Sequence, residues 1–306
     1  GPHAGLHRSG VVDVHAVATR IGRVQLYPAL EVEVTEDLAG FDQAFPAGAD
    51  YVIVPAMSND NDPAATSWLK QQAEKGARII GVCAGGLVVA NAGLLDGRQF
   101  ATHWYYRNKL LEAHPTAKYV PHRRYLIDGN VATTTGITAS VPMLLALIES
   151  IGGRERARAL ADELGVESWS PQHDSSKFGL NTERRWNYIL ARIAFWQHDQ
   201  WSVDVSDGMD DVALALAADA WSRTGRVSVA ASAAGPVELR SGMTLVAQPT
   251  GQDIPRLPLD AALKPIQQLE RTLCEISERF GDARRDRVTM ELEYPGIPPC
   301  WVRASH

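Results

Sequence analysis

The chain has 306 residues, 45% of them apolar, so it is long enough to bury one large core or two smaller ones. Its formal net charge of −6 and its dispersed basic residues exclude a broad positive field, so nucleic acid is not an expected partner. Three scattered cysteines, Cys83, Cys274 and Cys300, do not make a disulfide framework, which favours a reducing, cytoplasmic compartment. No apolar run is long enough to span a membrane, although an anchor upstream of Gly1 would lie outside this chain.

The first half of the chain alternates between predicted strands and helices. Strands are predicted over residues 11–18, 24–34, 51–54 and 78–82. The run from Tyr51 to Val54 is apolar throughout, as in a buried parallel strand. A helix is predicted between Pro63 and Gly76, and small apolar residues over 84–92 indicate a second, tightly packed helix. Strand, helix and strand in succession imply parallel pairing.

Further helices are predicted over residues 103–114 and 137–150, with short strands at 124–127 and 131–134 between them. The expected fold class is therefore α/β, with a flavodoxin-like parallel sheet covered by helices on both faces, in a domain of residues 1–166. Residues 167–200 are expected to form a helical connector. Aromatic and apolar side chains recur there at helical spacing and are interpreted as core packing, at Trp186, Ile189, Ile193 and Trp196.

An internal repeat lies in the second half of the chain. The matching segments are 7–14 with 222–229, 22–26 with 235–239, and 30–34 with 243–247. The second copy also has a predicted strand at 201–205 and a predicted helix at 210–221 upstream, and its similarity to the first ends after Gln248. Residues 201–306 are therefore interpreted as a partial second copy, with a helix over 259–280 and a terminal strand near 288–292.

Cys83 stands between a predicted buried strand and a glycine-rich helix start, in Gly81-Val82-Cys83-Ala84-Gly85-Gly86. Glycines permit the tight turn of a nucleophile elbow. We expect a lowered pKa for a thiol at that turn, because the free N–H groups and the dipole of the helix stabilise a thiolate. The same N–H groups could hold an oxyanion. The alternative interpretation is a buried core cysteine.

The elbow and several later motifs together resemble the ThiJ/PfpI superfamily, which has a class I glutamine amidotransferase-like fold. The later motifs are Ala92-Gly93-Leu94-Leu95-Asp96-Gly97-Arg98, Ala101-Thr102-His103-Trp104, and Asp128-Gly129 with Thr134-Thr135-Gly136-Ile137-Thr138-Ala139. They are most similar to the branch that contains isocyanide hydratases and the ligand-sensing domains of AraC-type transcription regulators. The resemblance covers residues 5–166, about half of the chain.

This resemblance implies roles for individual residues. Cys83 corresponds to the nucleophile, the N–H of Ala84 to one half of the oxyanion hole, and Ala56 with Met57 to the other half, where the family usually has glycines. The motif residues Thr102 and Thr135 are expected to line the ligand pocket. His103 is the candidate catalytic base, although a single histidine beside a tryptophan is more often structural.

The sequence departs from the family pattern at two catalytic positions. Ala84 stands where isocyanide hydratases usually have threonine and proteolytic members histidine, so the adjacent proton donor or base is missing. The opening Gly1-Pro2 resembles the Gly-Pro that follows the family's acidic residue, so that acid is expected to precede this chain. In the second copy the acid position falls at Ala213, and Asp210 and Asp211 are interpreted as a helix cap and a solvated first-turn residue.

Two functions follow from this pattern. One is hydrolase-like or hydratase-like chemistry on a small electrophile through Cys83. The other, favoured by Ala84 and by the missing acid, is a non-catalytic module for ligand sensing or assembly. No metal, no cofactor and no nucleic acid is expected. The expected partners are a small molecule and a second copy of the chain in a homodimer, with the partial repeat completing the sheet within the chain or across that dimer.

Overall fold

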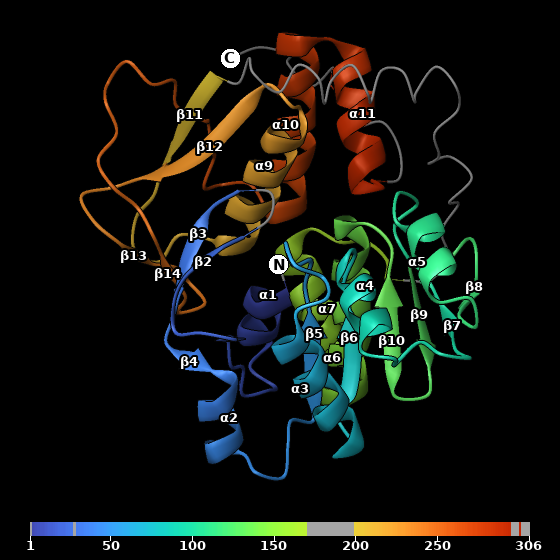
Figure 1. The fold of residues 1–306 in the computed structure, drawn as a ribbon. Coiled ribbons are helices and arrows are strands. Elements are labelled where there is room, and N and C mark those ends of the chain that lie inside the picture. The colour runs from blue at the N-terminus through green and yellow to red at the C-terminus, as the bar shows by residue number, and fades with distance from the viewer. Residues whose placement is uncertain (1, 27–28, 170–198, 295–299, 301–306) are drawn as a thin grey trace.

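The first half of the molecule is built on a four-stranded sheet of order β5-β6-β10-β9 (Figure 1). This is seen in a computed structural model that describes residues 2–26, 29–169, 199–294 and 300. The strands are Tyr51–Val54, Arg78–Gly81, Val131–Thr134 and Tyr125–Asp128, in that spatial order. β5, β6 and β10 are parallel, and β9 is an antiparallel edge strand. The predicted parallel sheet is present, and β9 and β10 form the predicted pair of short strands.

Helices cover both faces of this sheet. Ile79 and Val131 face α3 (Pro63–Glu74) and α4 (Gly85–Asn91), whereas Ile80 and Ala132 pack with Met143 of α6 (Ser140–Gly152) on the other face. Alternate residues of a strand point to opposite faces, so apolar residues throughout β6 and β10 require a helical layer on each side. The flavodoxin-like α/β fold expected from the sequence is therefore observed.

The remaining elements of the first half are short. They are helices α1 (Pro2–Ser9), α2 (Leu38–Ala44), α5 (Arg107–Ala113) and α7 (Arg154–Leu164), a 3-10 turn (Ile137–Ala139), and two-stranded pairs of β1 (Val17–Ala18) with β4 (Glu36–Asp37) and β7 (Gln99–Phe100) with β8 (Lys118–Tyr119).

Three elements predicted for the first half have the wrong bounds. Only Val17 and Ala18 of the strand predicted at 11–18 are paired. The stretch predicted at 24–34 is a hairpin, β2 (Gly22–Gln25) with β3 (Glu31–Val34). The helix predicted from His103 begins at Arg107, because residues 104–106 form a turn.

The second half begins with a strand and a helix close to their predicted positions, followed by a parallel strand. β11 (Asp199–Asp204) and β12 (Val227–Ser232) flank α9 (Asp211–Arg223), followed by β13 (Val237–Glu238) and β14 (Thr244–Leu245). Asp210 caps α9 by accepting the N–H groups of Val212 and Ala213, as expected. Asp211, expected to be solvated, is 9% exposed and therefore buried.

Two helices end the described chain, where the sequence predicted a helix and a strand. α10 (Pro265–Phe280) starts six residues later than the predicted Leu259, at a proline that favours the first helical position. The strand predicted at 288–292 is wrong, since residues 282–292 form helix α11, which begins after Gly281 at a φ of 87°. Within the described residues, no helix combines the length and apolar character needed to cross a bilayer.

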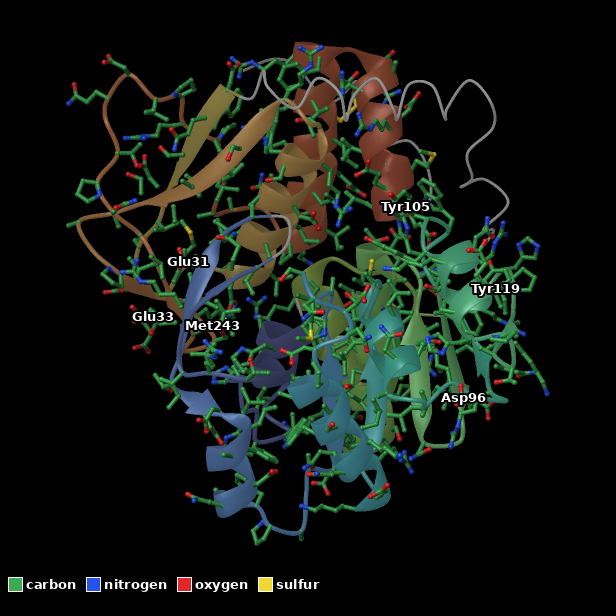
Figure 2. All side chains as sticks on the ribbon, viewed as in Figure 1. Glu31, Glu33, Asp96, Tyr105, Tyr119 and Met243 are labelled. Carbon is green, nitrogen blue, oxygen red and sulfur yellow. A yellow bond between two sulfur atoms is a disulfide. The ribbon has the colours of Figure 1, made fainter. Side chains whose placement is uncertain are left out.

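A hairpin from each half of the chain pairs with the other. The sheet β13-β14-β3-β2 joins β14 antiparallel to β3, with Leu245 opposite Val32. Leu245 and Val32 are 1% and 2% exposed, and the N–H of Val246 donates to the carbonyl of Glu31 over 2.8 Å. Figure 2 shows Glu31 and Glu33 of β3 beside Met243 at this joint. Among the described strands, β11 pairs with β12 and not with β5–β6–β10–β9, so it does not extend the first sheet.

Helices of the two halves share one apolar core. Leu145 and Ile148 of α6 belong to the same buried cluster as Leu214 of α9 and Leu269 and Leu273 of α10, and each is 1% exposed or less. An ion pair crosses the same boundary: Arg8 of α1, whose side chain is 4% exposed, lies 2.9 Å from Asp210 at the start of α9, whose side chain is 31% exposed. This core and ion pair hold the second half against the first. The aromatic segment predicted as helical at 186–196 lies outside the described residues.

A disulfide joins Cys274 of α10 to Cys300, with Cα atoms 5.2 Å apart. The scattered positions of the three cysteines predicted no disulfide framework, and this pair corrects that prediction. Cys274 and Cys300 are 26 residues apart, and α11, which packs back against α10, lies between them in the chain. The expectation of a reducing compartment rested on unlinked cysteines and loses that support.

We expect Leu245→Ala to destabilise the protein by about 2–5 kcal/mol, because it leaves a cavity where the two hairpins meet in the core. Thr244→Ala, one residue away and only half-buried, should change stability by less than about 0.5 kcal/mol. Urea unfolding followed by circular dichroism measures both changes. Equal effects of the two substitutions would show that the β3–β14 joint does not contribute to stability.

Candidate functional site: a covered cysteine elbow

Cys83 occupies a sharp turn between β6 and α4. Its φ is 56°, in the left-handed region that residues other than glycine rarely adopt. Its N–H donates to the Thr134 hydroxyl at 3.0 Å, which attaches the turn to the end of β10. The strand-to-helix turn expected from the sequence is therefore present, with the strained backbone of an elbow.

Gly85 brings the start of α4 against the end of β5. A Cβ atom at Gly85 would lie 1.9 Å from the carbonyl oxygen of Val54, so no other residue fits without a shift of the backbone. This contact places the elbow beside Pro55, Ala56 and Met57, which follow β5 directly. The two segments expected to supply oxyanion N–H groups therefore lie at the same edge of the sheet.

Cys83 keeps part of its residue surface exposed, but its sulfur is surrounded by protein atoms. This desolvation raises the pKa of the thiol to about 11, while Arg223 and the N–H of Ala84 lower it by less. The expected lowering of the pKa is therefore wrong for this structure. Two physical reasons account for it. The N–H groups of Gly85 and Gly86 are bonded to the carbonyls of Val82 and Cys83, at 2.8 and 3.2 Å, so they do not face the sulfur. The charges of Glu293 and Asp219 add to the rise.

The two threonines expected in the ligand pocket are both buried beside the elbow strands. Thr102 is 2% exposed, and its hydroxyl has no hydrogen-bond partner among the residues that the structure describes. Thr135 is also 2% exposed, and its hydroxyl donates to the carbonyl of Arg124 at 3.3 Å. Thr102 therefore has a free polar group to offer a ligand, whereas the Thr135 hydroxyl is engaged in the fold.

His103 is 4% exposed, and both of its ring nitrogens are engaged. Nε2 lies 2.6 Å from the carbonyl oxygen of Glu291, and Nδ1 accepts the N–H of Tyr105 at 3.2 Å. Burial lowers the pKa of His103, which favours the neutral ring with its proton on Nε2. In this arrangement His103 attaches the C-terminal end of α11 to the first half, and neither nitrogen is available as a base.

The end of α11 packs on the loops that follow β7 and β10, beside the elbow, and no motif in the sequence indicated this contact. Glu293 is 2% exposed, and its carboxylate accepts the N–H of Trp104 at 3.2 Å and the N–H of Gly136 at 3.1 Å. The Trp104 ring donates to the carbonyl of Met290 at 3.1 Å, and the Thr138 hydroxyl donates to that of Leu292 at 2.9 Å. Figure 2 shows Tyr105 near the lower end of α11, where the two halves meet.

A buried group of charges from α9 and α11 stands over the same region. Arg223 lies 2.6 Å from Asp219 and 3.6 Å from Glu291, which also lies 3.4 Å from Arg287. Burial raises the pKa of both Asp219 and Glu291. The acids whose charges act on the thiol therefore come from α9 and from the end of α11, at positions that no family motif marked. Their proximity depends on the packing of distant helices.

The sheet, the elbow and its flanking motifs define an α/β protein with a cysteine at the turn after a central strand. Residues 2–150 match the model of the DJ-1/PfpI family. The isonitrile hydratase of Pseudomonas putida is 31% identical over 169 residues, which cover 54% of this chain and 70% of that protein. The chain belongs to the DJ-1/PfpI family.

Other relatives are regulators and a protein of the same fold. The HTH-type transcriptional regulator GlxA of Rhizobium meliloti (strain 1021) is 36% identical over 140 residues, 42% of this chain and 43% of the regulator. A THiJ/PfpI family protein from Pseudomonas syringae has the same fold, with a TM-score of 0.51 and 20% identity over 63% of this chain and 79% of its own. The chain thus spans less than half the length of GlxA, and the family match ends before the second half begins.

We expect Gly85→Ala to destabilise the protein by about 1–3 kcal/mol or more, because its Cβ would overlap the end of β5. Gly235→Ala is the matched control, since a Cβ at Gly235 meets nothing within 4 Å and its φ is not in the left-handed region. Thermal unfolding of both variants measures the difference. A Gly85→Ala variant as stable as Gly235→Ala would contradict the close contact between α4 and β5.

We expect the contribution of Cys83 to stability to fall as the pH rises from about 9 to about 11, the interval between its ordinary pKa and its raised one. In that interval the unfolded chain loses the thiol proton while the folded chain keeps it, so ionisation favours unfolding. Below this interval both states keep the proton, so ionisation of Cys83 has no effect on stability. The difference in the free energy of urea unfolding between the wild type and Cys83→Ala, followed across this pH range, measures the effect of Cys83 ionisation. A constant difference between them would contradict the raised pKa.

Proposed function

We propose that this chain is a small-molecule-binding module of the DJ-1/PfpI family, in which Cys83 lines a covered pocket and does not act as an activated nucleophile. The observation that carries this proposal is the burial of the thiol, which raises its pKa to about 11. A thiol with that pKa is almost wholly protonated near neutral pH, and the thiolate is the reactive form.

The groups around the thiol support the same proposal. Ala84 offers no side-chain hydroxyl or imidazole, and both nitrogens of His103 are bonded. A cysteine enzyme needs a base or a lowered pKa to generate its nucleophile, and neither is evident in this arrangement. Thr102, whose buried hydroxyl lacks a partner among the described residues, gives the pocket a polar group for recognition instead.

Helix α11 connects the region of the elbow to the rest of the molecule, so a ligand that moves α11 also affects the helices packed against it. α11 contacts both the elbow region and α10, and α10 packs on α9 in the shared core. A ligand that binds better when α11 is displaced would shift the population towards the open arrangement. This is a sensing role of the kind that relatives named as transcriptional regulators suggest, without DNA binding by this chain itself.

A second candidate is hydrolase-like or hydratase-like addition at Cys83. The strained φ of 56° and the N–H of Ala84 beside the sulfur favour it, as does the likeness to an isonitrile hydratase. In this reaction the thiolate would add to an electrophilic carbon, and water would then release the product and restore the thiol. It requires α11 to leave the elbow and the pKa of Cys83 to fall.

Assembly is a third role, and it is compatible with the first. The joint between β3 and β14 pairs the two halves within the chain, in a sheet separate from β5-β6-β10-β9. A homodimer formed through other surfaces stays a prediction, which light scattering on the purified protein would test.

We expect iodoacetamide to modify Cys83 in the folded protein at least about ten-fold more slowly than in the urea-unfolded chain, because the folded thiol is both covered and protonated. Without reductant, the disulfide of Cys274 and Cys300 leaves Cys83 as the free thiol, so intact-protein mass spectrometry reads it directly. Cys83→Ser is the unreactive control. Faster modification in the folded state would contradict the proposal and support the catalytic candidate.

A further inference from the structure

Strand β2 is an open edge of the sheet that joins the two halves. The spatial order of that sheet is β13-β14-β3-β2, so among the described strands only β3 lies beside β2 (Figure 1). The Arg23 side chain is 63% exposed, and a Cβ atom at Gly22 would meet nothing within 4 Å. Ile21 and Leu26, which flank the strand, are 63% and 38% exposed. An accessible strand edge of this kind can pair with another strand.

The hydrogen bonds of the hairpin show which backbone groups of β2 face outward. The N–H of Leu26 donates to the carbonyl of Leu30 at 2.9 Å, so these two residues form a hydrogen-bonded pair. Such pairs alternate with non-hydrogen-bonded pairs along an antiparallel ladder, and the register of β2 with β3 places Arg23 and Gln25 in the second kind. Their backbone N–H and C=O groups therefore point away from β3. Within the described part of the chain these groups have no partner.

The polar side chains of β2 suit pairing with an identical strand. Two copies of β2 that run antiparallel about Val24 place Arg23 of each copy opposite the partner's Gln25. The Gln25 side-chain N–H group donates to the carbonyls of Leu26 and Leu30, at 3.1 and 2.8 Å, which leaves its amide oxygen to accept from the partner's Arg23. A register centred on Arg23 would instead place the two arginines opposite each other, and like charges disfavour it.

The apolar face of β2 is incomplete at the same edge. Val24 packs against the core that the two halves share, but it is only partly buried. In the register centred on Val24 this side chain lies directly opposite the partner's Val24, in a non-hydrogen-bonded pair, where facing side chains approach most closely. Pairing would therefore cover apolar surface that the single chain leaves in contact with water.

We propose that β2 is a homodimerisation surface, in which the β2 strands of two copies pair antiparallel about Val24 and continue the four-stranded sheet across both molecules. A second copy fits better than an unrelated strand, because the contacts of Arg23 with Gln25 and of Val24 with itself are reciprocal under a two-fold axis. This surface is separate from the β3–β14 joint and from the elbow. The proposal therefore does not depend on the role of Cys83.

Sedimentation equilibrium of the full chain tests for the dimer. A short paired edge should give a reversible association, so the mean mass of the wild type is expected to rise towards that of a dimer between about 1 and about 500 µM. Arg23→Pro removes an outward N–H, and proline is tolerated at edge positions whose N–H faces solvent. We expect it to weaken dimerisation at least about ten-fold relative to Arg23→Ala, the matched control that loses the same side chain but keeps the N–H.

Two further variants test the register. Gln25→Arg should weaken dimerisation, because it places an arginine opposite the partner's Arg23. Val24→Cys, in a Cys83→Ala background that lacks the free thiol, should form a disulfide-linked dimer when the folded protein is treated with diamide. Ile21→Cys in the same background is the control, since position 21 is more exposed but lies far from its counterpart in this register. Non-reducing electrophoresis measures both reactions.

The proposal would be overturned by a wild type that stays monomeric throughout this range, or by an Arg23→Pro variant that dimerises as tightly as Arg23→Ala. Circular dichroism checks that each variant folds. If Arg23→Pro does not fold, the cross-linking result decides, and a Val24→Cys dimer that forms no faster than the Ile21→Cys dimer contradicts the pairing. None of these outcomes bears on the binding role proposed above, which the reactivity of Cys83 tests separately.

Discussion

The contact between the end of α11 and the elbow controls the chemistry of this molecule. The carbonyls of Met290, Glu291 and Leu292 accept hydrogen bonds from Trp104, His103 and Thr138, so the C-terminal carbonyls of the helix are satisfied by the family domain. The charge of Glu293, at the end of this helix, acts on the Cys83 thiol, whose sulfur is desolvated although the residue keeps part of its surface exposed. Desolvation then outweighs the helix dipole, and the thiol keeps its proton.

The position of α11 depends in turn on the pairing of the two halves. β3 and β14 form one sheet, α6 shares a core with α9 and α10, and Arg8 is paired with Asp210 across the boundary. Each of these contacts joins residues that are far apart in the sequence, by 66 positions for Ile148 and Leu214 and by 202 for Arg8 and Asp210. Together these contacts hold α11 above the first sheet (Figure 1).

Several features of the site follow from local sequence, and others do not. Cys83 follows an apolar strand and comes shortly before two glycines, so its elbow was predictable, as were the capping role of Asp210 and the strand before α9. The pKa of Cys83 was predicted with the wrong sign, because the local motif shows the helix dipole but not what covers the sulfur. Residues 288–292 were predicted as a strand because short apolar runs do not distinguish the two kinds of element. The apolar spacing of Val288 and Leu292 is the signal that would have indicated a helix.

By itself the sequence determined the family, the parallel sheet with its two helical layers, and the presence of a cysteine at a strand-to-helix turn. These properties depend on neighbouring residues, whose periodicity and glycine spacing are visible in the chain. Only the tertiary structure decided that Glu293 lies between the N–H groups of Trp104 and Gly136, and that Cys274 meets Cys300. Such contacts join residues distant in sequence, so they depend on how whole helices pack. The same packing sets how far the Cys83 sulfur is buried, and this burial determines the pKa of the thiol.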